Sequence, residues 1–164
     1  MNDESTKKPC LIRARDRGPE ASMSHPFNPN SLIHGHLLGM ATGLERIGVN
    51  LIRVPPGKES FIYHRHHGEE EFLYILSGRG IAEIGDETFE VGPGDFMGFP
   101  VPSVAHHLKN PFEEDLVYLS CGEKKPTEIA EFPRLGKTMI RSGSQVSIFE
   151  TSAAEAFPGL EKVK

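Results

Sequence analysis

Short runs of β-branched, aromatic and aliphatic residues follow one another from residue 49 to residue 121, and Gly, Asp or Pro separates many of them. The runs show no helical period. Many short strands at regular spacing are typical of an antiparallel sandwich or barrel, and Gly85-Asp86 reads as a tight hairpin turn. We therefore predict an all-β domain. Its expected strands cover residues 49–54, 60–66, 71–77, 80–85, 88–91, 95–100, 105–110 and 115–121.

The flanks of this series carry weaker signals. Residues 1–31 are rich in charges and turn formers and are predicted to form a partly flexible N-terminal arm. Residues 32–150 are predicted to form a single β-barrel domain, followed by a C-terminal tail over 151–164. Met139-Ile140 and residues 145–149 are expected to be late strands, paired with the barrel sheets or with a second subunit.

Two further segments have alternative interpretations. Residues 32–40 form a possible strand with His34 and His36 on one face. We interpret this pair as an exposed edge or a dimer contact rather than a second metal site, because no acidic residue or Cys stands nearby. Residues 152–157 carry alanines and a possible Ser cap, and form at most a short helix.

Composition and charge restrict the partners. The 164 residues carry 18 Lys and Arg against 23 Asp and Glu, for a formal net charge of -5, which disfavours nonspecific binding of nucleic acid or an anionic membrane. The apolar runs are too short to cross a bilayer, and residues 1–10 do not resemble a signal peptide. We expect a cytoplasmic protein that binds a small molecule, with Cys10 and Cys121 as free thiols.

Side chains of the types that bind metal ions lie in and between two of the expected strands. In an extended chain, His64 and His66 point to the same face and Arg65 to the other. A turn follows at His67-Gly68, and a carboxylate from the acidic cluster at residues 69–71 can then meet both imidazoles. Nitrogen and oxygen donors suit a divalent transition metal such as iron, manganese, nickel, copper or zinc. A later stretch that contains His106 is a candidate source of a fourth ligand.

Together these stretches resemble the paired motifs of the cupin superfamily. The first motif is a glycine, a His-x-His pair, a glutamate and a further glycine, and the second is a glycine, a Pro-x-Gly turn, a histidine and an asparagine. Two departures occur: one extra residue precedes His64, and Pro102 stands where a glycine is usual, with one residue inserted before His106. The resemblance extends over about residues 47–122. The matching residues are Gly57, His64, His66, Glu71 and Gly78, then Gly94, Pro100, His106 and Asn110.

The resemblance implies a double-stranded β-helix, or jelly-roll-like, barrel with N- and C-terminal extensions. One divalent transition metal per chain (iron, manganese, nickel or zinc) would lie inside it. The implied ligands are His64, His66, Glu71 and His106. Glu71 is preferred to Glu70 because it lies seven residues before Gly78, as in the family, and begins the alternation of its strand. A register shifted by one residue would exchange His66 and His106 for His67 and His107.

Three functions are compatible with such a centre. The first is a metal-dependent enzyme acting on a sugar or sugar phosphate, because small single-barrel cupins similar to this chain are often grouped with such isomerases. A base would move a proton through an enediol, and no residue outside the ligands is a convincing base. The second is a mononuclear iron dioxygenase, and the third is a non-catalytic cupin that only binds a small molecule.

Two further expectations concern assembly and substrate charge. We expect a homodimer in which residues 10–40 and 136–149 cover or extend the sheets. A phosphorylated ligand would need fixed cations near the barrel mouth. The basic residues closest in sequence to the ligand strands are Lys58, Arg53, Arg65 and Arg79, and the alternative for each of them is a solvated surface charge. If Arg53 is such a contact, Arg53→Ala is expected to weaken binding of a phosphorylated ligand selectively.

Overall fold

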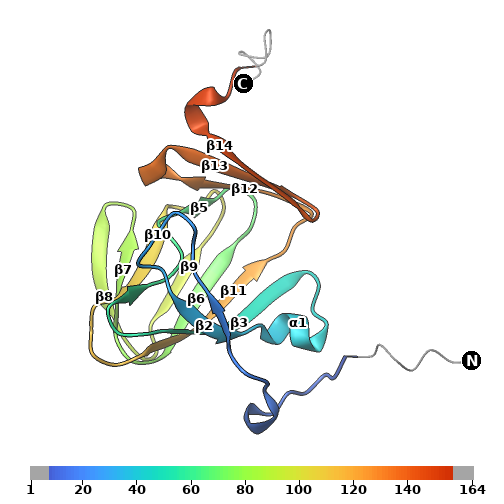
Figure 1. Cartoon of the computed structure of the whole chain (residues 1–164), viewed down its shortest axis with the longest axis vertical. Coiled ribbons are helices and arrows are strands. Elements are labelled where there is room, and N and C mark those ends of the chain that lie inside the picture. Colours follow the sequence, from blue (N-terminus) through green and yellow to red (C-terminus); the bar gives the residue numbers. More distant parts are fainter. Residues whose placement is uncertain (1–7, 157–164) are drawn as a thin grey trace, which may run out of the picture.

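Antiparallel strands make up most of the computed structural model, which describes residues 8–156 (Figure 1). The strands are β1 (Ala21–Met23), β2 (Ile33–His36), β3 (Ile47–Val54), β4 (Lys58–Glu59), β5 (Arg65–His66), β6 (Glu71–Ser77), β7 (Gly80–Ile84), β8 (Glu87–Val91), β9 (Phe96–Phe99), β10 (His106–Asn110), β11 (Leu116–Glu123), β12 (Thr127–Phe132), β13 (Lys137–Ser142) and β14 (Gln145–Glu150). The α-helix is α1 (Leu38–Thr42), and the 3-10 helices are η1 (Ala14–Asp16), η2 (Pro133–Leu135) and η3 (Thr151–Ala153).

Two sheets form the barrel and enclose the hydrophobic core. The larger sheet has the order β1-β2-β3-β11-β6-β9, and the smaller has the order β4-β10-β7-β8. Each strand buries alternate residues, so that in β6 Leu73 and Ile75 are buried while Tyr74 and Leu76 are exposed. The hairpin at Gly85-Asp86 joins β7 to β8, with Ile84 paired to Glu87. The structure thus confirms the predicted all-β, jelly-roll-like barrel.

A third sheet, of order β14-β13-β12-β5, lies above the barrel in Figure 1. The late strands β13 and β14 confirm the prediction, and they pair with β12 and with each other in the same chain. Strand β12 was not predicted, because its residues invert the usual pattern. Glu128 is buried at a position that faces the barrel, whereas the neighbouring Ile129 is exposed. Because an acidic residue occupies an inward position, the pattern of alternating hydrophobic and polar residues does not indicate a strand here.

The predicted continuous strand over residues 60–66 is wrong, because the chain changes partner within it. Strand β4 pairs with β10 in the barrel, whereas β5 pairs with β12 in the third sheet. His64, just before β5, forms an isolated bridge to His106 of β10. The residues between β4 and this bridge belong neither to the pairing of β4 with β10 nor to that of β5 with β12. The segment nevertheless ties the barrel to the third sheet at the position of the predicted ligands.

The predicted strand over residues 32–40 is also shorter than expected. Strand β2 ends at His36, and α1 begins at Leu38 and ends at Thr42, followed by Gly43, which adopts a left-handed conformation with φ of 84°. β1 pairs with β2, so the larger sheet ends at β1 rather than at the His34 strand. His34 Nδ1 lies 2.8 Å from Ser22 Oγ. Of the segment predicted to be helical at residues 152–157, η3 includes residues 152 and 153, and residue 157 lies outside the described part.

No helix within residues 8–156 is long and apolar enough to cross a membrane.

Candidate metal centre

Three imidazoles and one carboxylate meet inside the barrel. One ligand-type atom from each of His64, His66, Glu71 and His106 lies within 4.8 Å of the others. These four residues are called the metal centre below. His106 is the first residue of β10, and His64 pairs with it in an isolated bridge. His66 ends β5, and Glu71 begins β6. The rings of His64 and His66 have centroids 4.9 Å apart, as expected for side chains on one face of an extended segment.

Each imidazole is held through its Nδ1 atom, which leaves Nε2 directed toward the centre. His64 Nδ1 lies 2.7 Å from the Ile62 carbonyl oxygen, and His106 Nδ1 lies 3.1 Å from that of Val104. A carbonyl oxygen only accepts hydrogen bonds, so both Nδ1 atoms carry the proton and both Nε2 atoms present a lone pair. The His106 ring also stacks on Phe99, with centroids 3.6 Å apart and planes at 10°.

Glu71 faces these lone pairs. Its Oε2 atom lies 3.0 Å from His106 Nε2 and 3.5 Å from His66 Nε2, and its Oε1 atom accepts a hydrogen bond from Ser120 Oγ at 3.3 Å. A carboxylate oxygen and an imidazole lone pair at 3.0 Å are compatible only if a proton or a metal cation lies between them. The donor set of three nitrogens and one oxygen therefore fits a divalent transition metal.

The ionisation of the centre agrees with this fit. Burial by itself would raise the pKa of Glu71, but the close contacts with His106 and His66 outweigh it and hold that pKa far below its ordinary value. Burial, with a further contribution from His106, lowers the pKa of His64 to about 3, so this imidazole is neutral at pH 7. Metal ligation requires an ionised carboxylate and neutral imidazoles, and these two residues already have those forms.

A cavity of about 310 Å³ extends from the metal centre into the barrel. Its walls are mainly apolar, and its polar groups other than the histidines and Glu71 are Asn50, Ser60, Tyr118 and Ser120. No Lys or Arg is among the described residues that line it. An adjoining cavity, also about 310 Å³, shares His66 and Glu71 and contains Lys124 beside three glutamates, Glu69, Glu70 and Glu123.

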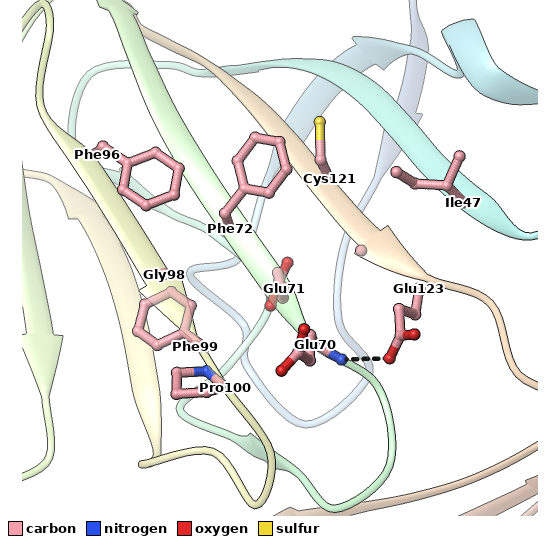
Figure 2. A pocket seen from close by; sticks show the side chains of 11 residues that line it. Ile47, Glu70, Glu71, Phe72, Phe96, Gly98, Phe99, Pro100, Cys121 and Glu123 are labelled. Carbon is pink, nitrogen blue, oxygen red and sulfur yellow. Dashed lines mark hydrogen bonds between the residues drawn. The ribbon is translucent and has the colours of Figure 1, made fainter.

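A third pocket, of about 420 Å³, lies near the outer face of β6 (Figure 2). The rings of Phe72 and Phe96 lie side by side there, with centroids 5.4 Å apart. At its rim the backbone N–H of Glu70 donates to Glu123 at 3.1 Å, shown by the dashed line in Figure 2. Glu71 lines this pocket as well as the inner cavity, so the beginning of β6 separates the metal centre from the outer surface.

Comparison with known proteins agrees with this geometry. A family model described as a cupin domain matches residues 50–122. A solved structure from Acidithiobacillus ferrooxidans, of a protein provisionally named a sugar phosphate isomerase, is 33% identical with a TM-score of 0.86, over 90% of this chain and 96% of that one. The chain belongs to the cupin superfamily. A sugar phosphate isomerase from a cupin superfamily, from Silicibacter pomeroyi, is 25% identical with a TM-score of 0.71, over 77% of this cupin and 81% of that chain.

An uncharacterized protein of Methanocaldococcus jannaschii is 37% identical to this cupin over 82 residues. The match covers 48% of this chain and 64% of that protein, so it spans slightly less than two thirds of the relative.

The neighbours of the predicted ligands occupy different surroundings. His67 is bound to Glu131 through Nε2 at 2.9 Å, and the buried His107 lies on the other face of β10 with Nδ1 3.4 Å from Glu83. The alternative register, with these two residues as ligands, is therefore wrong. Glu69, which belongs to the same acidic cluster as Glu71, is mostly buried and accepts a hydrogen bond from Arg141 at 2.5 Å. The structure brings the four predicted ligands together, and their binding of a metal stays a prediction.

The basic residues near the ligand strands do not reach the inner cavity. Arg53 lies between the inward-facing Ile52 and Val54, and it forms ion pairs with Glu20 at 2.6 Å and Asp115 at 3.3 Å. Arg53 therefore does not line the inner cavity, and its contact with a phosphate stays a prediction. Arg65 points away from the centre, as predicted, and pairs with Glu131.

One residue of this region was missed entirely from the sequence. Glu128 of β12 is 2% exposed, and its Oε1 atom lies 3.3 Å from His66 Nδ1. It stands 62 positions from His66 in the chain, outside both motifs. The only available signal was an acid within an otherwise β-compatible stretch, which is common on solvated strands.

Proposed function

We propose that this cupin is a metal-dependent enzyme that isomerises a small sugar or a closely related hydroxycarbonyl compound. The main support for this proposal is the position of three imidazole nitrogens and one carboxylate oxygen, which lie within 4.8 Å of one another and line one cavity of about 310 Å³. The names of the two similar solved structures support the reaction class, and the match to the first extends over 96% of its length.

A divalent ion held by the metal centre would act as a Lewis acid toward substrate oxygens. The chain's own residues prepare the site around it. Ser120 fixes one oxygen of Glu71, and Phe99 fixes the plane of the His106 ring. Burial, with a smaller contribution from the charge of Glu71, raises the pKa of Tyr118, so its hydroxyl stays protonated at neutral pH. Tyr118 therefore serves as a hydrogen-bond donor toward a bound substrate rather than as a base.

The lining of the inner cavity supports an uncharged substrate. A phosphate dianion there would lose its hydration without a Lys or Arg to compensate, among the described residues, and such desolvation is costly. Lys124 is the basic residue of the adjoining cavity, where Glu69, Glu70 and Glu123 accompany it. We therefore propose that the unphosphorylated sugar is preferred to its phosphate ester.

Turnover assays on the metal-loaded protein test this proposal. The metal-free protein would be loaded separately with iron, manganese, nickel and zinc and mixed with matched aldoses and ketoses, each with and without phosphate. Proton NMR in D2O would follow conversion and the exchange of solvent deuterium into the carbon next to the carbonyl. We expect conversion of at least one unphosphorylated pair, absent from the His106→Ala variant. A metal-loaded protein that converts neither form would contradict the isomerase.

Two other functions have distinct outcomes in the same experiment. The mostly apolar lining of the cavity also suits the substrate of a mononuclear iron dioxygenase. That function would show as substrate-dependent oxygen consumption by the iron-loaded protein alone. A cupin that only binds its ligand would give heat in a calorimetric titration, without conversion or oxygen consumption.

A further inference from the structure

Glu128 reaches the metal centre from the third sheet. Its side chain is only 1% exposed, and acidic side chains are rarely buried to this extent. The Oε1 atom accepts hydrogen bonds from the backbone N–H groups of His67 at 3.1 Å and Gly68 at 3.4 Å, and it lies 3.3 Å from His66 Nδ1. A single buried oxygen thus holds the turn after β5 and the ring of one predicted ligand.

The chain approaches this carboxyl group more closely than a side chain at Gly68 would permit. A Cβ atom built on Gly68 would lie 2.7 Å from Glu128 Oε2, a contact that real Cβ atoms do not make. Glycine at this turn therefore allows Glu128 to lie under the backbone. Its Oε2 atom has no hydrogen-bond partner in the described part of the chain. Burying a carboxyl group in this way is unfavourable unless the remaining contacts compensate, so the interaction with His66 and the turn has to be substantial.

His66 differs from the other two histidines in what holds it. His64 and His106 are fixed by carbonyl oxygens only two residues away, within their own segments. His66 depends on a side chain 62 positions later, in a strand beyond residues 50–122 that the family model matches. A carboxyl group on the far nitrogen of a metal-binding histidine fixes its tautomer and ring orientation and increases its basicity as a ligand.

We propose that Glu128 is a positioning residue for the metal centre, which keeps His66 in the tautomer with Nε2 free and so makes the third sheet part of the metal site. This inference rests on the proposed metal centre but not on the isomerase reaction.

The test compares Glu128→Ala, Glu128→Gln and Glu131→Gln in the full chain. Glu131 is the matched control, because it lies on the same strand and binds Arg65 and His67, which flank His66 in sequence. Cobalt(II) titration followed by visible absorption would give the metal dissociation constant. Long-range proton–nitrogen NMR spectra of the metal-free, 15N-histidine-labelled protein would give the tautomer of His66.

For Glu128→Ala we expect cobalt affinity to fall about 10- to 100-fold, as found for other residues that hold metal-binding histidines, and the His66 tautomer to become mixed. Glu128→Gln keeps an acceptor without the negative charge and should weaken binding by a smaller factor, with the tautomer retained. Glu131→Gln should match the unsubstituted protein in both measurements.

Unchanged cobalt affinity in Glu128→Ala, with only a lower melting temperature, would overturn the positioning role and leave Glu128 as a structural residue. If Glu128→Ala does not fold, unchanged affinity in Glu128→Gln overturns the role equally. The outcomes separate this inference from the proposed reaction. A protein that binds cobalt but isomerises no sugar removes the reaction alone, whereas an unsubstituted protein that binds no cobalt removes both.

Discussion

Replacing Asn110 by Ala should destabilise the barrel strongly, although Asn110 does not contact the metal centre. Asn110 is the last residue of β10, the strand that begins with His106, and it is 0% exposed. Its Nδ2 atom donates to the Val54 carbonyl at 2.8 Å and to the Glu114 carbonyl at 2.7 Å, and its Oδ1 atom accepts from the Phe112 N–H at 3.1 Å. The side chain thus joins β3 and the loop before β11 to the end of β10.

The size of the effect follows from these contacts. The Val54 carbonyl would be left buried without a donor, which costs about 1–3 kcal/mol, and each of the two part-buried contacts contributes about 0.5–1.5 kcal/mol. The sum is roughly 4 kcal/mol, which corresponds to a fall in melting temperature of about 8–16 °C for a chain of this length.

Asn30→Ala is the matched control for this substitution. Asn30 Nδ2 also makes two contacts, with the Gly57 carbonyl at 3.1 Å and Glu59 Oε1 at 3.3 Å, but the first of these is exposed to water. Its loss should cost less than about 1 kcal/mol, because water replaces the missing donor. Thermal unfolding followed by circular dichroism would measure both variants. Equal melting temperatures for Asn110→Ala and Asn30→Ala would refute the reasoning.

Two further predictions concern the stability of the barrel. Gly78→Ala should lower the melting temperature well beyond Gly57→Ala: both glycines have positive φ, 75° and 69°, but a Cβ at Gly78 would lie 2.1 Å from the Asp115 carbonyl oxygen, whereas Gly57 has nothing within 4 Å. Equal losses would contradict the close approach. Glu83→Gln should destabilise the protein at pH 7 and not near pH 2. Burial would raise the pKa of Glu83, but Arg134 and Lys109 outweigh it and lower the pKa to about 2, so its stabilising effect is lost as the pH falls through that value. Denaturant unfolding at both pH values measures this, and a difference that persists near pH 2 would count against it.

The sequence predicted the residues of the metal centre because their spacing is local. His64, His66 and Glu71 lie within eight consecutive positions, and His106 and Asn110 share one short strand. Strand alternation and family spacing together therefore decided which acid faces inward. The same local patterns predicted most barrel strands and the Gly85-Asp86 hairpin, since one buried face imposes a strict period of two on each strand.

The features that sequence reasoning missed depend on contacts between distant segments. Nothing local shows that the chain changes sheets between His64 and Arg65, because the partner strand β12 lies some 60 residues later. Glu128 was overlooked since an acid at a buried position contradicts the hydrophobic pattern. Arg53 was considered as a phosphate contact because it is close in sequence to the ligand strands, whereas its ion-pair partners Glu20 and Asp115 are distant in the sequence. The predicted homodimer and its small-molecule ligand remain predictions.

Elemental analysis of metal in the purified protein tests the central claim most directly. The unsubstituted chain should carry one divalent transition metal, and alanine substitution at each of the four residues of the metal centre should remove most of it. His67→Ala and His107→Gln should retain the metal, because both side chains lie outside the centre. Full metal occupancy in His106→Ala, or loss in the His107 variant but not in the His106 variant, would contradict the assignment.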